Sequence, residues 1–220
     1  MSEPTLIETI IIGDTHADFD GYRQMIADAE QAHGRTLPSI HVGDYGFGWF
    51  APQEERAVEA FHRRNPRHRF IRGNHDDPAT IKVAPGYLLD GSISASVLFI
   101  GGAAGAIKDW ETELTTDQMM AILASLKAMV KKPTVIISHE APLEAAGPLC
   151  ANLARSLRPC RTKSFLSEVL TLVKPYLWLF GHWHHPWSAD IGGTHFRALG
   201  YNESFTMPLP WQPNAFIEKA

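Results

Sequence analysis

Short, uninterrupted runs of apolar and β-branched residues recur along the chain and are typical of buried β-strands. They lack the alternation of polar and apolar positions that a half-exposed strand shows, so both faces of each strand are expected to be covered. Six segments have this pattern: residues 6–12, 39–42, 68–71, 97–100, 134–137 and 177–180. The pattern therefore predicts a core built on buried strands.

Amphipathic helical patterns lie between these runs. Apolar residues from Phe19 to Ala29 share one helical face, and Gly34 is the expected C-cap. Residues 52–64 begin with acidic and end with basic side chains, the order that a helix dipole favours. Both segments are therefore predicted to be helices.

Two further helices are predicted in the second half of the chain. Residues 115–118 (TTDQ) resemble a capping box, so a helix is expected to begin there. Its predicted buried face consists of Met119, Leu123, Leu126 and Val130. A second apolar stripe runs from Phe165 to Val173 and ends before Pro175.

Strands that alternate with helices at this spacing predict an α/β fold. The 220 residues fit a single domain spanning 1–220, and no internal repeat or low-complexity linker divides them. Residues 206–220 contain three prolines and are predicted to form an extended C-terminal tail. We expect Trp211 and Phe216 to anchor this tail.

Composition narrows the class of protein. Hydrophobic residues make up 45% and charged residues 20% of the chain, which is typical of globular proteins. A net charge of −4 argues against a protein that binds polyanions over much of its surface. Cys150 and Cys160 are too few for a disulfide scaffold and are expected to be free thiols. Neither a signal peptide nor a bilayer-spanning stretch is recognised, so we expect a cytoplasmic protein without membrane contact.

Five of the predicted strands run directly into residues of metal-ligand type. The segments are GDTH at 13–16, GD at 43–44, GNHD at 73–76, SH at 138–139 and GHWH at 181–184. Loops from the carboxyl ends of strands in an α/β sheet converge on one site, and glycine at the exit lets the backbone turn sharply. Asp14, Asp44 and Asn74 lie 30 positions apart, about one βαβ unit each. We therefore expect these side chains to meet.

The combined donor set points to a pair of transition-metal ions. It comprises Asp14, His16, Asp44, Asn74, His139, His182 and His184. Imidazole and carboxylate together suit Mn, Fe, Co, Ni or Zn. Seven side chains are too many for one such ion and about right for two. Taken singly, His16 or His139 is more often an ordinary capped or buried histidine, so the prediction depends on the whole set.

The ordered series of these five motifs resembles the calcineurin-like metallophosphoesterase family. The segment VLFIGGA at 97–103, followed by a tryptophan, is similar to small bacterial and phage members. The resemblance implies a four-layer α/β/β/α sandwich with a dinuclear site at one edge. It assigns one metal ion to Asp14, His16 and His184, and the other to Asn74, His139 and His182. Asp44 would bridge the two ions.

The implied activity is hydrolysis of a phosphomono- or phosphodiester bond by a hydroxide that bridges two divalent ions. Mn²⁺ is the ion expected to support activity in vitro, with Fe, Zn, Ni or Co as alternatives. His75 matches the family histidine that contacts the phosphate and protonates the leaving oxygen, a role worth about 10²–10⁴-fold in rate.

The chain departs from the protein phosphatases of this family in its second motif. Phe47 and Gly48 stand where those enzymes have an aspartate and an arginine, which counts against a protein phosphatase. The missing aspartate would orient the catalytic histidine. Asp76 is only a weak substitute, and a turn or capping role is favoured for it.

A basic segment follows the strand that leads to His139. Arg155 and Arg158 are candidates for gripping a polyanionic substrate, because a guanidinium binds phosphate through two parallel bonds. They lie in a run with Arg161 and Lys163 for which a solvated loop is the default interpretation. The aromatic residues beside the metal motifs, for which packing is favoured over base stacking, are Trp49, Phe50, Trp183 and Trp187.

Three functions remain open at this point. The leading hypothesis is a phosphoesterase that acts on a phosphorylated small molecule or nucleotide. A nuclease acting on single-stranded ends would use the same ions, but the acidic net charge makes nucleic acid the less favoured substrate. A scaffold without catalysis is the third hypothesis, and the full donor set argues against it.

Overall fold

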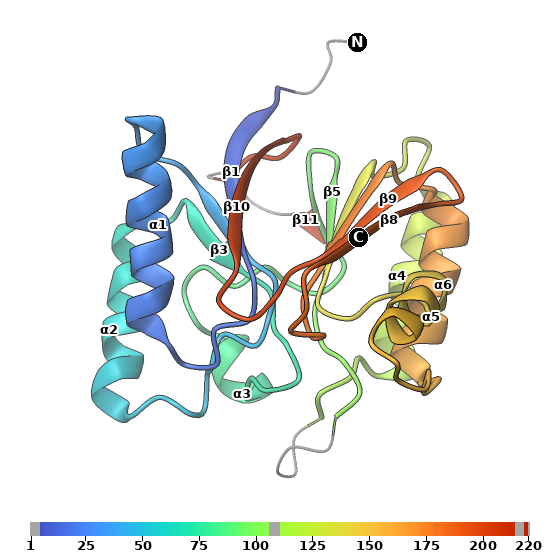
Figure 1. Ribbon diagram of the computed structural model, residues 1–220, viewed down its shortest axis with the longest axis horizontal. Helices are drawn as coiled ribbons and strands as arrows, with labels where there is room; N and C mark the ends of the chain where they lie inside the picture. Colours follow the sequence, from blue (N-terminus) through green and yellow to red (C-terminus); the bar gives the residue numbers. More distant parts are fainter. Residues whose placement is uncertain (1–4, 106–110, 214–217, 220) are drawn as a thin grey trace.

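Two β-sheets packed face to face, with helices on their outer faces, form the described part of the chain, which is residues 5–105, 111–213 and 218–219 of a computed structural model (Figure 1). The strands are β1 (Ile7–Ile12), β2 (Ser39–His41), β3 (His68–Phe70), β4 (Ser92–Ser94), β5 (Val97–Ile100), β6 (Val135–Ser138), β7 (Leu177–Phe180), β8 (Trp187–Ile191), β9 (Thr194–Ala198), β10 (Ser204–Leu209) and β11 (Glu218–Lys219). The helices are α1 (Phe19–His33), α2 (Pro52–Arg64), α3 (Pro78–Ile81), α4 (Thr116–Ala128), α5 (Leu143–Asn152) and α6 (Arg161–Val173).

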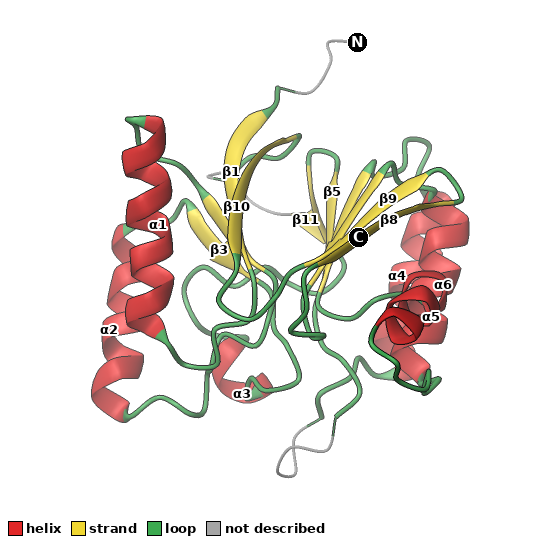
Figure 2. Cartoon of the chain, in the orientation of Figure 1, coloured by secondary structure: helices red, strands yellow, loops and turns green. Residues whose placement is uncertain are grey.

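The first sheet has the order β10-β1-β2-β3 and the second the order β11-β4-β5-β6-β7-β9-β8. Strands β1, β2 and β3 are parallel, and so are β5, β6, β7 and β9. Helices α1 and α2 cover the outer face of the first sheet, and α4, α5 and α6 cover that of the second (Figure 2). This is the predicted four-layer sandwich.

Alternate residues of each central strand belong to different cores, which explains why the strands lack polar positions. Ile10 and Ile12 pack toward α1 and α2, whereas Ile11 packs between the sheets. In the second sheet Leu98 packs toward the outer helices and Phe99 toward the first sheet. A strand buried on both faces carries apolar side chains throughout.

Helix α1 ends and helix α4 begins where their capping signals predict. Gly34 adopts the left-handed conformation (φ 61°) as the C-cap of α1. Thr115 and Gln118 form a reciprocal capping box at the start of α4. One expectation is wrong: Val130 is fully exposed, because α4 ends at Ala128 and the backbone is extended at Met129. In the part of the chain that the structure describes, no helix combines the length and apolarity needed to cross a bilayer.

Two parts of the predicted C-terminal tail belong to the sheets: residues 206–209 are in β10 of the first sheet, and β11 pairs with β4 in the second. Strand β10 pairs antiparallel with β1, and Pro208 is tolerated because β10 is an edge strand. Trp211 is fully buried, as expected of an anchor, and its indole N–H donates to Thr9 Oγ1 at 2.7 Å. Phe216, the other expected anchor, lies outside the described residues.

Candidate metal centre

The strand register brings the carboxyl ends of the first sheet into line. Ile12 pairs with His41, and His41 pairs with Phe70. Asp14, Asp44 and Asn74 follow these three positions within a few residues. All three side chains are buried, with exposed fractions between 0 and 4%. In the second sheet, Ser138 pairs with Phe180, and His139 and His182 follow at the same edge.

The glycines that precede these residues are required by close packing between the motifs. A Cβ at Gly73 would collide with the Asp44 carboxylate, and one at Gly181 would collide with Asp14. Each carboxylate therefore occupies the space that a side chain on the neighbouring loop would take. At the other two motif glycines, a Cβ on Gly43 would collide with the His139 ring and one on Gly13 with the Gly200 carbonyl, so close packing accounts for all four glycines.

A first group of possible ligands consists of Asp14, His16, Asp44 and His184, whose ligand atoms all lie within 4.8 Å of one another. His184 Nε2 is 3.0 Å from Asp14 Oδ2, and His16 Nε2 is 3.6 Å from Asp44 Oδ2. His184 is exposed and His16 is half-buried. This group is open to solvent on the side of His184.

A second group consists of Asp44, His139 and His182, again with ligand atoms within 4.8 Å. His139 Nε2 lies 3.3 Å from Asp44 Oδ1 and 3.1 Å from Asn74 Oδ1, which adds Asn74 to the group. Asp44 thus belongs to both groups. Its Oδ2 is the atom near His16, and its Oδ1 is the atom near His139.

Several of these residues have a strained backbone. Positive φ angles occur at His16 (45°), Asp44 (56°), His182 (66°) and His184 (53°). A side-chain-bearing residue in this region costs on the order of 1–3 kcal/mol, and such residues cluster at functional sites. The backbone conformation therefore lowers stability at four residues that all belong to the two groups of possible ligands.

The electrostatics of the second group favour a positive charge. Burial alone would lower the pKa of His139, but the Asp44 and Asp14 carboxylates raise it to about 10. Burial would raise the pKa of Asp44, yet His139 and the His75 backbone N–H lower it. A carboxylate and an imidazolium therefore face each other, and a cation that binds must displace the proton. Two carboxylates, one amide oxygen and four imidazoles fit divalent transition-metal ions.

His75 lies beside the first group. Its ring meets the His16 ring edge to face at 4.8 Å between centroids. Its backbone N–H donates to Asp44 Oδ1 at 2.7 Å, and its carbonyl accepts from the Trp49 indole at 2.8 Å. The backbone of His75 is therefore held from both sides.

Asp76 does not orient His75. Its buried carboxylate accepts hydrogen bonds from the backbone N–H groups of Gly73, Tyr45, Gly46 and Phe47. The favoured turn role is therefore the one observed: Asp76 fixes the loop after β2 against the loop after β3. Burial, together with the nearby Asp44 charge, raises its pKa to about 6.

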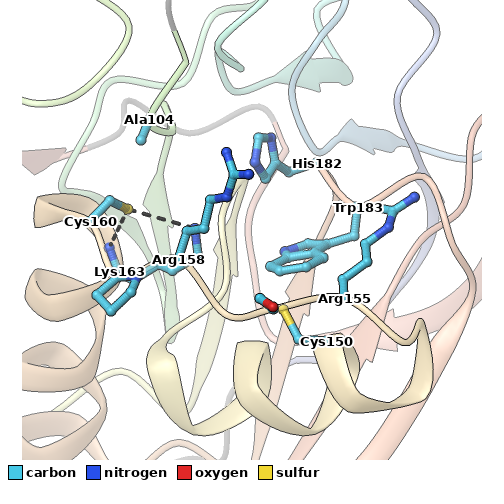
Figure 3. Close-up of a pocket in the computed structure, with 10 residues that line it drawn as sticks. Ala104, Cys150, Arg155, Arg158, Cys160, Lys163, His182 and Trp183 are labelled. Carbon is cyan, nitrogen blue, oxygen red and sulfur yellow. Dashed lines mark hydrogen bonds between the residues drawn. The ribbon is translucent and has the colours of Figure 1, made fainter.

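Arg155 and Arg158 are exposed and line a cavity of about 690 Å³ that also includes His182 and Trp183. In Figure 3 the Arg158 side chain extends toward His182, and Arg155 lies on the side of Trp183. Cys150 and Cys160 also line the cavity and are free thiols, as predicted.

Two other cations of the basic segment do not belong to a solvated loop. Both lie at the start of α6, where Lys163 is buried against Glu140 and Arg161 pairs with Glu113 at 3.5 Å. Among the described residues, no carboxylate pairs with Arg155 or Arg158. These two arginines are therefore available to an anionic ligand.

The remaining aromatic residues have mixed roles. Phe50 is buried in the core, and Trp187 packs against the core cluster under the second sheet, as favoured from the sequence. Trp49 is half-exposed and contacts His75, while Trp183 lines the cavity.

Two residues near the centre were missed from the sequence. Tyr201 is half-exposed, and its ring stacks on His16 with centroids 5.7 Å apart. It follows β9, a strand that the sequence pattern did not predict. Glu140 is buried next to His139 and contacts His182. Its position directly after the candidate ligand His139 was the available signal.

The fold and the gathered donors define a metal-binding α/β/β/α protein. A model of the calcineurin-like phosphoesterase family matches residues 7–186, and the chain belongs to this family. It is therefore a metallophosphoesterase, a hydrolase of phosphoric esters. None of the curated proteins has a sequence that matches this chain.

Solved structures show the same fold at low sequence identity. One crystal structure aligns over 97% of this chain and 98% of its own, with 13% identity and a TM-score of 0.62. GAP50, the anchor in the inner membrane complex of Plasmodium, has 11% identity and a TM-score of 0.55 over 90% of this chain and 72% of its own. A putative 5'-nucleotidase from Staphylococcus aureus has 11% identity and a TM-score of 0.51 over 93% and 51%. At these identities the likeness concerns the fold alone.

Proposed function

We propose that this chain hydrolyses phosphomono- or phosphodiester bonds with two divalent transition-metal ions. The observation that carries the proposal is the position of Asp44, which presents Oδ2 to one group of donors and Oδ1 to the other. Asp14, His16 and His184 would hold one ion, and Asn74, His139 and His182 the other. Mn²⁺ is the ion we expect to work in vitro, with Fe, Zn, Ni and Co as alternatives.

When bound, such a pair of ions activates a water molecule and neutralises charge on the phosphoryl group. The chain's own part is to hold the donors rigidly before the substrate arrives. Burial of Asp14, Asp44 and His139 and the strained backbone of His16, Asp44, His182 and His184 serve this purpose.

His75 is the proposed proton donor to the leaving oxygen. Its backbone is fixed by Asp44 and Trp49, and its ring lies against His16 at the open side of the first group. A general acid needs to be within hydrogen-bond reach of the leaving atom and partly accessible, and the ring of His75 meets the second condition.

The cavity beside His182 is the proposed site for the part of the substrate that does not react. Its volume of about 690 Å³ is in the range of small-molecule sites. Arg155 and Arg158 would bind a second negative charge there. We therefore propose a phosphorylated small molecule or nucleotide as the substrate, in preference to nucleic acid. The free thiols of Cys150 and Cys160 support a cytoplasmic location.

Assays with three substrates test this proposal. The purified chain, with Mn²⁺ added, would be given a mono-aryl phosphate, a bis-aryl phosphate and single-stranded DNA. We expect hydrolysis of at least one aryl ester, abolished by a chelator and restored by Mn²⁺. Faster cleavage of DNA than of either aryl ester would favour a nuclease. Turnover of none of the three, by protein that binds no metal, would favour the scaffold.

A further inference from the structure

Glu140 is a fully buried carboxylate that sits directly behind the second group of donors. Lys163 Nζ from α6 donates to its Oε2 at 2.6 Å. Its Oε1 accepts from the Trp183 indole at 2.9 Å and from the Ala141 backbone N–H at 2.8 Å. Oε2 also lies 3.4 Å from His182 Nε2. The carboxylate therefore contacts two consecutive residues of the GHWH segment.

Stability alone does not account for this arrangement. A buried ion pair is often no more stable than two apolar residues of the same volume, because desolvation offsets the attraction. Glu140 and Lys163 are both nearly inaccessible, with side-chain exposed fractions of 0 and 9%. What an apolar pair could not supply is the polar contact to the His182 ring and to the Trp183 indole.

The backbone contacts of His182 do not orient its ring. The residue has a φ of 66°, and its backbone N–H donates to Asp14 Oδ2 at 3.0 Å. That bond fixes the backbone but does not select which ring nitrogen faces the other donors. A metal-binding histidine is typically oriented by a carboxylate on its other ring nitrogen.

We infer that Glu140 is a positioning residue for the second metal ion. Its Oε2 lies 3.4 Å from His182 Nε2 and would accept a proton carried on that nitrogen, which would leave Nδ1 for the ion. The bond to Trp183 holds the segment that carries His182, and the Trp183 indole and the Ala141 N–H keep Glu140 in place. This inference rests on the proposed two-metal function.

Metal titration of matched variants tests the inference. Glu140→Gln alone leaves Lys163 buried without a partner, so the informative variant is Glu140→Gln combined with Lys163→Met. Lys163→Met by itself is the control, because it removes the same ammonium and retains the carboxylate. His182→Ala marks the affinity of a chain that has lost one ligand of the second ion.

Mn²⁺ binding would be measured by calorimetry, with thermal unfolding of the metal-free proteins as the check of the fold. In the double variant we expect one ion to bind as in the parent chain and the other to bind about 10–100-fold more weakly, as in His182→Ala. Lys163→Met should bind both ions with affinities within about threefold of the parent. A folded double variant that binds both ions as tightly as Lys163→Met would overturn the inference.

The number of ions that the parent chain binds distinguishes failure of this inference from failure of the proposed two-metal function. If the parent chain binds fewer than two ions, the two-metal proposal is wrong, and so is the inference that rests on it. If the parent binds two ions and the double variant does the same, only the role of Glu140 is wrong.

Discussion

In two buried regions of the molecule, the pKa values of histidines are shifted in opposite directions. His62 and His68 lie in the aromatic core between the first sheet and its helices, where burial lowers their pKa values to about 4 and about 3. His139 is equally buried at the strand ends, yet its pKa is raised to about 10. The difference lies in the neighbours of each ring.

The core histidines have neutral partners. His62 contacts the Tyr45 hydroxyl at 3.0 Å and the His68 carbonyl at 3.0 Å, and His68 contacts the Ser39 hydroxyl at 2.9 Å. His139 instead faces the Asp44 carboxylate at 3.3 Å. Adjacent carboxylates, rather than burial, therefore distinguish histidines placed to meet a cation from those that belong to the core.

The largest expected effect is the loss of the carboxylate that the two metal groups share. Asp44→Asn keeps the shape of the side chain but removes its charge and one ligand oxygen. We expect the chain to bind fewer than two ions and kcat/KM to fall by about 10³-fold or more, because the lost interactions are worth several kcal/mol. Elemental analysis and steady-state kinetics would measure both quantities.

The matched control for Asp44→Asn is His62→Gln in the aromatic core. This variant should lose stability, because a buried hydrogen-bonding group is changed, but it should keep its metal content and kcat. Equal loss of metal in both variants would contradict the distinction between the two regions.

The next effect concerns His75, which lies beside the metal groups but is not assigned to either. His75→Ala should retain both ions and lose about 10²–10⁴-fold in kcat with alkyl esters, whose leaving oxygen needs a proton. The loss should be smaller with 4-nitrophenyl esters. Equal losses with both kinds of ester would remove His75 from the role of acid.

Acid should destabilise the aromatic core through its neutral histidines. The folded-state pKa of His62 lies below the unfolded value of 6.5, so the unfolded chain binds more protons between pH 6.5 and 4. Its contribution to the free energy of unfolding is complete above pH 6.5 and decreases as the pH falls through this window. Between pH 7 and 4.5 the loss for this one residue is about 2 kcal/mol.

Urea denaturation of metal-free protein at the two pH values would measure this loss. The comparison of the parent chain with His62→Gln isolates the residue from the metal-centre histidines, which both proteins share. A pH dependence identical in the two proteins would show that His62 is not held neutral by burial.

The smallest effect is expected at the rim of the cavity. Arg155→Gln combined with Arg158→Gln should raise KM about tenfold for a substrate that carries a second phosphate, because charge-assisted hydrogen bonds are lost. KM for an ester without the second charge should not change, and kcat should be unaffected. An unchanged KM for both substrates would show that the two arginines belong to a solvated loop and do not bind the substrate.

The two regions also differ in how far the sequence alone could predict them. The strand-end motifs were predictable because each joins a buried strand to a ligand-type residue, in four of the five cases through a glycine, and the register of parallel strands brings them together. A turn role was favoured for Asp76 from the sequence, but its hydrogen-bond partners were not predictable. Its four backbone partners lie on two loops, one of which is about 30 residues away.

Elements at the sheet edges were the hardest to predict. Residues 206–209 of β10 were interpreted as part of a tail because prolines occur at 208, 210 and 213, yet an edge strand tolerates Pro208. The hairpin of β8 and β9 was missed although Gly192 and Gly193 occupy its turn with positive φ angles of 59° and 88°. That two-glycine turn is a recognisable hairpin signal. Lys163 was taken for a solvated cation because its partner, Glu140, is 23 residues away.

The central claim is that Asp44 lies between two cations, one on each side of its carboxylate. Anomalous X-ray diffraction from crystals grown with Mn²⁺ tests this claim most directly. We expect two anomalous peaks, one between Asp14, His16 and His184 and the other between Asn74, His139 and His182, with Asp44 contacting both. A single peak, or peaks away from Asp44, would contradict it.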